Sequence, residues 1–165
     1  MPSISFQEIS EADWRATLQL TVHPDQQRFV ADYVPIAAII LAKAYIRPGG
    51  LQWMPYAIRA QDQLIGLLAL VYESNSAANY WIYHFFIDQE QQGKGQGKAA
   101  LHALVTFIQQ QHPNCQHLKL TVHPENTRAQ RLYTSMGFQP TGEHQAGEPV
   151  YAVRVRDKPL HTGDG

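Results

Sequence analysis

The chain has 165 residues, a length that suits one domain around one hydrophobic core. Hydrophobic residues make up 44% of it and the formal net charge is −1, which excludes a disordered chain and argues against a nucleic-acid partner, because phosphate backbones are bound by an excess of Lys and Arg. No basic-then-apolar leader opens the sequence, and the longest apolar run, residues 36–44, is far shorter than the ~20 residues of a membrane span, so we expect a soluble, cytoplasmic protein with no membrane partner.

The first part of the chain predicts a strand followed by helices. Residues 4–9 have the composition of a short strand, and Ser10 followed by Asp13 is typical of a helix start. The segment 25–45 predicts two further helical pieces, and Pro35 stands where it favours the first turn of the second piece. The sheet-forming part of the chain follows these helices.

A β-hairpin and a third strand come next. Residues 56–60 and 64–72 are apolar runs separated by a polar turn, which predicts a hairpin with a buried second strand. After a loop at 73–79, residues 80–87 (YWIYHFFI) are rich in the aromatic side chains that favour strands.

The pattern then changes its period. After Gly97, apolar residues fall at i, i+3, i+4 and i+7, which predicts an amphipathic helix that ends before Pro113. Residues 118–122 alternate as a strand should. A second helix follows, with Asn126 as its expected N-cap and Gly137 just past its end.

Two short strands complete the predicted fold. Residues 138–143 and 150–156 are joined across a turn, and the polar tail 158–165 is expected to be disordered. The order of elements is therefore strand, helices, three strands, helix, strand, helix and two strands. It predicts a mixed α/β domain with a central sheet, which we expect to span residues 1–157.

The segment 87–101 (IDQEQQGKGQGKAAL) contains the strongest chemical signal. A strand ends there and an amphipathic helix begins, and three glycines fall at alternate positions between them: Gly93, Gly95 and Gly97. Glycines let backbone N–H groups approach an anion closely, and a helix N terminus adds the positive end of its dipole. The pattern predicts a cradle for a phosphate or pyrophosphate, with Lys94 and Lys98 adding charge.

Two common nucleotide-binding motifs fit this segment poorly. A Walker A loop would need Ser or Thr where Ala99 stands and glycine where Gln92 stands. The strict dinucleotide fingerprint would need glycine at Lys98. Its looser form, starting at Gly95 and ending on Ala100, lacks the acidic residue expected about 20 positions further on.

Residues 92–97 (QGKGQG) instead match the Q/R-x-x-G-x-G/A signature of the GNAT acetyltransferases. Residues 126–138 (NTRAQRLYTSMGF) are similar to the N-x-x-A-x-x-x-Y-x-x-x-G-F segment of the same family. Both segments occur in the family's order and on the predicted elements, and the resemblance extends over residues 56–155. It implies a central mixed, mostly antiparallel, twisted sheet of about seven strands flanked by about four helices.

The resemblance also implies that acetyl-CoA is the co-substrate and that no metal takes part. In the family, amides of the glycine-rich loop hold the CoA pyrophosphate, the Asn contacts the CoA arm, and the Tyr lies beside the thioester sulfur. Carried over to this sequence, the residues expected to bind the cofactor are Phe85, Phe86, Ile87, Gln92, Gly93, Lys94, Gly95, Gln96, Gly97, Lys98, Asn126, Arg128 and Tyr133. Considered alone, Asn126 is a helix cap and Tyr133 a core aromatic.

Within the family, the chain looks most like bacterial spermidine/spermine-type N-acetyltransferases. The similar stretches are residues 85–101 and 20–31. This implies a small-molecule amine as acceptor, with a polyamine as the favoured class, and leaves a homodimer open. The residues expected to frame the acceptor are Gln26, Gln27, Phe29 and Tyr33. The acidic residues near its expected entrance are Asp25, Asp32, Glu143 and Glu148.

The catalytic candidates are Tyr133, His84 and Tyr83. Those relatives commonly have a carboxylate on the strand where this chain has Tyr83 and His84, so the base is not identified. His84 is expected to relay the amine's proton, with a hydrogen-bonded sheet histidine as the alternative, and Tyr133 to protonate the departing thiolate. Neither the histidines nor Cys115, the one cysteine, form a recognised metal or nucleophile motif.

Other functions stay open at this point. The chain is also compatible with a non-catalytic acyl-CoA sensor on the same fold, or with an acetyltransferase for peptide N termini, lysine or aminoglycosides. A different nucleotide-binding protein using the glycine-rich loop is a further alternative. ATP or NAD, rather than CoA, would then stabilise the protein.

Overall fold

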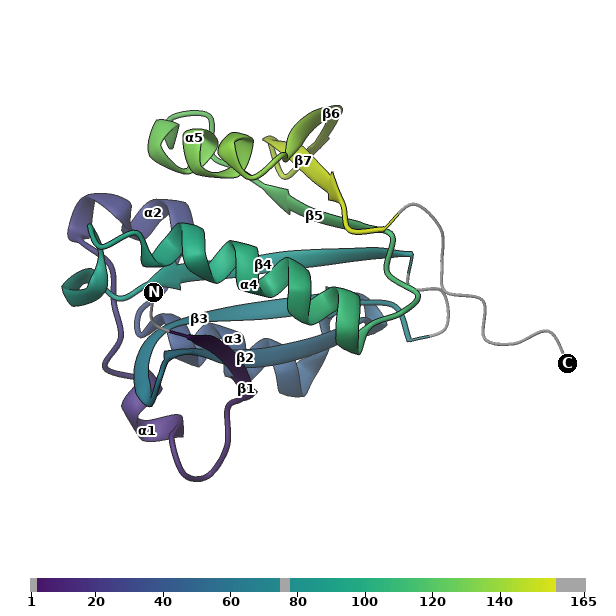
Figure 1. Cartoon of the computed structure of the whole chain (residues 1–165). Coiled ribbons are helices and arrows are strands. Elements are labelled where there is room, and N and C mark those ends of the chain that lie inside the picture. Colours follow the sequence, from purple (N-terminus) through teal and green to yellow (C-terminus); the bar gives the residue numbers. More distant parts are fainter. Residues whose placement is uncertain (1–2, 75–77, 157–165) are drawn as a thin grey trace, which may run out of the picture.

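The computed structural model describes residues 3–74 and 78–156, which form a seven-stranded sheet with helices on both faces (Figure 1). The strands are β1 (Ile4–Glu8), β2 (Gln52–Ala60), β3 (Gln63–Tyr72), β4 (Asn79–Ile87), β5 (His117–Thr121), β6 (Gln139–Gln145) and β7 (Glu148–Arg154). The α-helices are α1 (Trp14–Thr17), α2 (Gln27–Val30), α3 (Ile36–Ile46), α4 (Gln96–Gln111) and α5 (Thr127–Ser135). Three 3-10 turns accompany them: η1 (Pro24–Gln26), η2 (Pro48–Gly50) and η3 (Gln89–Gln91).

The predicted order of elements and the mixed, mostly antiparallel sheet are confirmed. Among the described residues there are five α-helices, as many as the residue patterns predict and one more than the about four that the resemblance implies; α1 and α2 are single turns of four residues each. The tail 158–165 lies outside the described residues. Among those described, no helix has the length and apolar character needed to cross a bilayer.

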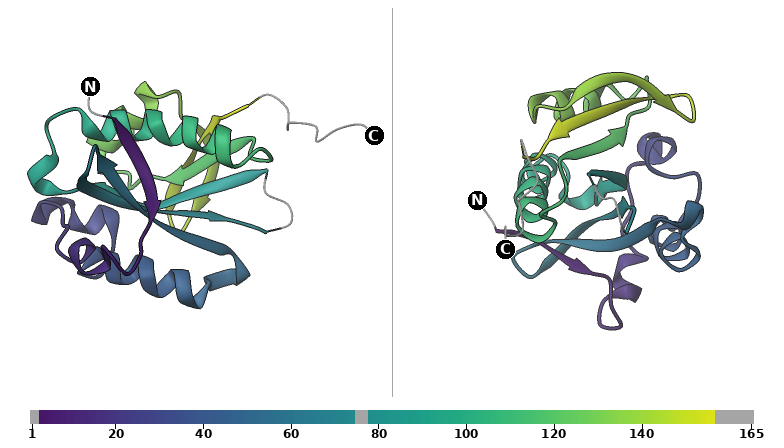
Figure 2. Two further views of the ribbon diagram at one scale, coloured as in Figure 1. Left: turned by 60° about the horizontal axis from the view of Figure 1, so that its bottom comes forward. Right: turned by 90° about the vertical axis from the view of Figure 1, so that its right-hand side faces the viewer.

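The strand order is β1-β2-β3-β4-β5-β7-β6, and only the β4–β5 pair is parallel. The side chains of the sheet divide into two buried clusters. One joins the sheet to α4 through Leu101, Leu104 and Ile108, and the other joins it to α3 through Ile36 and Ile40. Figure 2 shows α4 on one face of the sheet, with α2 and α3 on the other. Both faces are therefore covered, and a binding site must lie at an edge or an interruption of the sheet.

That interruption lies between β4 and β5. The two strands pair only from Asn79 to Trp81 on β4, opposite His117 to Lys119 on β5. Beyond this short ladder β4 continues to Ile87 while β5 turns away, and Figure 1 shows the two strands diverging. The backbone of β4 past Trp81 therefore has no strand on its β5 side.

A β-bulge marks the same part of β4. His84 has a φ of 54°, in the left-handed region, and the register with β3 shifts between Leu67 and Ala69. A bulge leaves an extra residue on one strand and turns its side chains relative to the sheet. It sets the directions of Tyr83, His84 and Phe85 beside the split.

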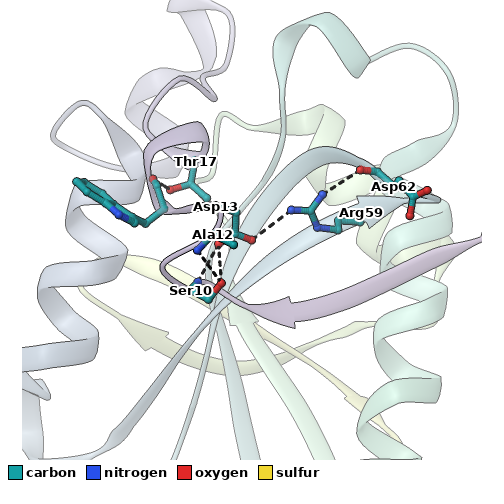
Figure 3. A network of polar contacts seen from close by, with 7 residues as sticks. Ser10, Ala12, Asp13, Thr17, Arg59 and Asp62 are labelled. Atoms are coloured by element: carbon teal, nitrogen blue, oxygen red, sulfur yellow. Dashed lines mark hydrogen bonds and ion pairs between the residues drawn. The ribbon is translucent and has the colours of Figure 1, made fainter.

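A polar network fixes α1 against the β2–β3 hairpin (Figure 3). The Asp13 carboxylate accepts the Ser10 backbone N–H at 2.8 Å and pairs with the Arg59 guanidinium at 3.3 Å. Arg59 also donates to the Asp62 carbonyl at 2.9 Å. Asp13 is 8% exposed, so its charge needs these partners. A helix does follow Ser10 as predicted, but it begins at Trp14 with Asp13 as its N-cap and no side-chain capping bond.

Candidate active site

A cavity of about 300 Å³ fills the split between β4 and β5. It is bounded by the end of β4, the glycine-rich loop and start of α4, the end of β5, the first turns of α5, and α2 with the chain before it. Its lining residues are Val22, Gln26, Phe29, Val30, Phe85, Phe86, Ile87, Gln92, Gly93, Gly95, Gln96, Gly97, Lys98, Thr121, Val122, His123, Asn126, Arg128, Ala129, Leu132 and Tyr133. The two sequence segments that resemble the family thus meet at one cavity.

The glycine-rich loop presents open backbone amides to this cavity. Gly93 and Gly95 have φ of 79° and 75°, a conformation that favours glycine. The Gly95 carbonyl accepts the first bond of α4, from the Ala99 N–H at 3.2 Å. The amides before Ala99 therefore have no acceptor within the helix. No acidic residue lies in the first turn of α4, although Lys98 does, so an anion bound there would be stabilised by both the helix dipole and Lys98.

The start of α5 forms the neighbouring wall. The Asn126 side-chain oxygen accepts the Ala129 N–H at 3.2 Å, which confirms Asn126 as the N-cap. Gly137, with φ of 92°, follows the end of the helix as expected. Across the cavity, the buried side-chain oxygen of Gln96 has no hydrogen-bond partner within the described residues. An unsatisfied buried acceptor and a row of open amides fit a large ligand with both donor and anionic groups, as CoA has.

Tyr133 extends from α5 into the interior and lines the cavity. Its ring packs against Phe138, with ring centres 5.6 Å apart. Burial raises the pKa of the Tyr133 hydroxyl well above its ordinary value, because the phenolate would be poorly solvated. The side chain is therefore protonated at neutral pH, as a proton donor must be.

Residues 21–30 form a further side of the cavity, and we call them the acceptor wall because the sequence predicts the acceptor there. Thr21 is held at both backbone groups, since its N–H donates to the Asp88 carboxylate at 2.9 Å and its carbonyl accepts the Gln89 N–H at 2.8 Å. On the other side of the wall, the ring of Phe29 packs against the ring of His123, with ring centres 5.0 Å apart. The wall thus bridges the split from β4 to the end of β5.

His84 lies behind this wall rather than on the cavity lining. Its Nδ1 lies 2.7 Å from the Val30 carbonyl and its Nε2 lies 2.9 Å from Lys43 Nζ. Because a carbonyl only accepts, Nδ1 is the protonated nitrogen and Nε2 accepts from Lys43. Burial first, and Lys43 in addition, lower the pKa of His84, and burial lowers the pKa of Lys43. His84 is therefore neutral with both nitrogens bonded, and the relay role stays a prediction that requires the Lys43 contact to break.

Tyr83 points toward the β6–β7 hairpin instead of the cavity. Its hydroxyl donates to the Gln145 side chain at 2.5 Å, and its ring stacks on Trp53 with centres 5.3 Å apart. Burial raises the pKa of Tyr83, so this hydroxyl is also protonated. Tyr83 links β4 to the hairpin, and its catalytic role stays a prediction.

The cavity includes every residue expected to bind the cofactor except Lys94. Of the residues expected at the acceptor, Gln26 and Phe29 line it, whereas Gln27 and Tyr33 do not. Sequence reasoning missed Val22, Val30, Thr121, Val122, His123, Ala129 and Leu132. The residues at 121–123 had a signal, because they lie at the carboxyl end of a predicted strand, where α/β folds place ligands. Within the described ranges, no group of three or more His, Cys, Asp or Glu side chains is placed to hold a metal.

Comparison with known proteins agrees with this geometry. The model of the acetyltransferase (GNAT) family matches residues 6–138. The spermine/spermidine N(1)-acetyltransferase of Bacillus subtilis is 30% identical over 145 residues, which cover 86% of this chain and 91% of that protein.

Solved structures show the same fold. The spermidine N-acetyltransferase of Vibrio cholerae in complex with CoA and spermine has a TM-score of 0.68 at 19% identity, over 92% of this chain and 95% of that one. The Salmonella typhimurium enzyme that modifies the N-terminal serine of ribosomal protein L7/L12 has a TM-score of 0.70 at 17% identity, over the same shares of 92% and 95%. The chain belongs to the acetyltransferase (GNAT) family and is an acetyl-CoA-dependent N-acetyltransferase that transfers acetyl groups to amines.

Proposed function

We propose that this chain acetylates a primary amine of a small polyamine-like molecule by direct attack in a ternary complex. The observation that supports direct transfer is the single cavity in the β4–β5 split, where the amide cradle, Tyr133 and the acceptor wall face one another. The polyamine class is supported by the 30% identity to the Bacillus subtilis spermine/spermidine N(1)-acetyltransferase over 86% of this chain.

The two helix starts would hold acetyl-CoA. The open amides before Ala99, with Lys98, suit the pyrophosphate, and the unpaired Gln96 side-chain oxygen suits a donor of the same ligand. Asn126 and Arg128 stand beside this cradle at the start of α5. The bound thioester supplies the activated acetyl group.

The proposed reaction requires the protein to position the two substrates and to protonate the leaving sulfur. The ammonium form of the amine first gives a proton to solvent, and the neutral amine then attacks the thioester carbonyl. As the C–S bond breaks, the leaving sulfur takes a proton from the Tyr133 hydroxyl, and the proton lost by the new amide nitrogen restores that hydroxyl. A backbone N–H of β4 past Trp81 is free of the β5 ladder and would stabilise the oxyanion that develops on the carbonyl oxygen. No covalent enzyme intermediate is required.

Turnover of acetyl-CoA with a panel of amines tests this proposal. The panel contains spermidine, spermine, a peptide with a free N terminus, a lysine side-chain analogue and an aminoglycoside, and release of the CoA thiol is followed. We expect the polyamines to give the highest kcat/KM. Preference for the peptide, lysine or the aminoglycoside would overturn the acceptor class. Tight binding of acetyl-CoA with no turnover on any amine would indicate a sensor.

A further inference from the structure

The Gln92 side chain has its hydrogen-bonding groups engaged within the protein. Its Nε2 donates to the Ile87 carbonyl at 2.9 Å and to the Gln26 side-chain oxygen at 2.9 Å. Its Oε1 accepts from Gln26 Nε2 at 3.1 Å and, more weakly, from the Arg128 guanidinium at 3.5 Å. A primary amide offers two donor hydrogens and two acceptor lone pairs. The capacity of Gln92 is therefore full, although the residue belongs to the cofactor loop.

We propose that Gln92 is a positioning residue that, through Gln26, fixes the acceptor wall against the cofactor loop. The side chain of Gln92 then acts on the amine's side of the cavity rather than as a ligand of CoA. This inference rests on the proposed function, since it assigns an effect to one of the two substrates. It concerns the side chain alone and leaves the backbone of the loop in the amide cradle.

The contacts of the acceptor wall are unequal on its two sides. Toward β4 and the loop, the wall is fixed at Thr21 by the buried Asp88 carboxylate and at Gln26 by the paired amides. Toward α5, its contacts are the Phe29 ring against the His123 ring and an ion pair that joins Arg28 to Glu125, whose side chains are 57% and 65% exposed. Exposed ion pairs contribute little, about 0–1 kcal/mol. The position of the wall is therefore set mainly from the loop side.

Loosening the wall should leave the cradle intact. The open amides of α4 depend on the conformations of Gly93 and Gly95, which do not require Gln26. The wall, in contrast, places Phe29 and Val30 on the lining. Losing the amide pair should therefore change the amine's KM and kcat more than the affinity for acetyl-CoA.

A double-mutant cycle tests this proposal. We expect Gln26→Ala and Gln92→Ala each to lower kcat/KM for the amine by about tenfold, and the double variant to lower it no further, because each single change already removes the pair. The Kd of acetyl-CoA, measured by calorimetry, should stay within about threefold of wild type in all three. The matched control is Gln91→Ala, one residue earlier and outside the cavity lining, which should resemble wild type in both measurements.

Two results would overturn the proposal. A Kd for acetyl-CoA that rises about tenfold in Gln92→Ala but not in Gln26→Ala would make Gln92 a CoA ligand. Additive losses in the double variant would mean that the two residues act separately. If Gln92→Ala does not fold, Gln26→Glu serves instead. The glutamate carboxylate can still accept a hydrogen bond from Gln92 but cannot donate one. A change in kcat/KM for the amine as small as that of Gln91→Ala would therefore contradict the proposal.

Hydrogen exchange separates this inference from the proposed function. Without any substrate, the amide of Ala31, which donates to the Gln27 carbonyl at 3.1 Å at the end of α2, should exchange faster in Gln26→Ala and Gln92→Ala than in wild type or Gln91→Ala. If the two variants exchange faster but the wild-type protein acetylates no amine, the role of the Gln26–Gln92 contact is retained and the proposed function is rejected. Unchanged exchange would reject the contact whatever the turnover.

Discussion

The two sides of the cavity are built on different principles. The cofactor side, where the sequence predicts CoA to bind, consists of the starts of two helices, α4 and α5, and the groups it offers to a ligand belong largely to the backbone. The acceptor wall includes only two short helical turns, η1 and α2, and is held by side-chain contacts to residues more than sixty positions away, such as Thr21 with Asp88 and Gln26 with Gln92.

This difference predicts opposite sensitivities. Backbone amides tolerate changes of side chain but not of glycine conformation, since Gly93 and Gly95 lie in the left-handed region. A wall held by side-chain contacts tolerates substitution of its exposed side chains that make no contact, but not the loss of a hydrogen-bonding partner. The predictions that follow challenge this contrast, beginning with Tyr133, the cofactor-side residue whose side chain is proposed to take part in the chemistry.

Tyr133→Phe should have the largest effect. The change keeps the ring and its packing on Phe138 and removes only the proton donor. A positioned acid contributes roughly 10²–10⁴-fold, and a thiolate is a moderate leaving group, so we expect kcat to fall about 100-fold. The KM for acetyl-CoA should change little, because the proton is needed only in the transition state. Steady-state kinetics on the best amine decide this, and a kcat within about threefold of wild type would make Tyr133 a packing residue.

Gly95→Asp should abolish the advantage of the backbone cradle. It places a side chain on a residue with φ of 75° and a negative charge beside the expected pyrophosphate. We expect the affinity for acetyl-CoA to fall more than about tenfold, or ~1.4 kcal/mol. Gly142→Asp is the matched control, because Gly142 has φ of 86°, nothing lies within 4 Å of its added Cβ, and it is outside the cavity lining. Equal affinities of the two variants for acetyl-CoA would show that the glycine-rich loop does not bind CoA.

The same contrast explains what the sequence predicted. The loop and α5 follow local rules: glycines for a left-handed backbone, Asn126 for a cap, and helical spacing that turns Tyr133 inward. The acceptor wall follows no local rule, because Gln26 and Gln92 are ordinary polar residues until the fold pairs them. His84 shows the limit most clearly. Its place in the strand suggested a relay, whereas the bulge at its positive φ directs the ring to Val30 and Lys43.

Asn126→Asp tests whether this residue does more than cap. Asp is an equally good N-cap, so the melting temperature should stay close to that of wild type. The new negative charge faces the cavity where CoA is expected, and we predict a loss of affinity for acetyl-CoA of about threefold to fivefold. Calorimetry with acetyl-CoA measures it. Unchanged affinity and stability together would leave Asn126 as a cap alone.

His84→Gln should have the smallest effect on turnover and a distinct effect on stability. Glutamine offers one donor for the Val30 carbonyl and one acceptor for Lys43, so the acceptor wall should keep its place. If His84 only positions that wall, kcat at pH 8 should stay within about threefold of wild type. A loss of more than about tenfold, with a shifted acid limb in the pH–rate profile, would instead identify His84 as the proton relay.

The stability effect follows from the sign of the pKa shift. Burial lowers the pKa of His84 in the folded state, whereas in the unfolded chain it titrates near about 6.5. As pH falls below that value the unfolded state binds the proton first, so the stability contributed by neutral His84 is lost as pH falls toward the lower folded pKa. The melting temperature of wild type should therefore drop more between pH 7 and pH 5 than that of His84→Gln. His112 is half-buried and its pKa is also lowered by burial, so part of the slope should remain in the variant and decrease further when His112 is replaced as well. Parallel slopes in wild type and His84→Gln would mean that His84 is protonated as easily in the folded protein as in the unfolded chain, which burial and the Lys43 contact oppose.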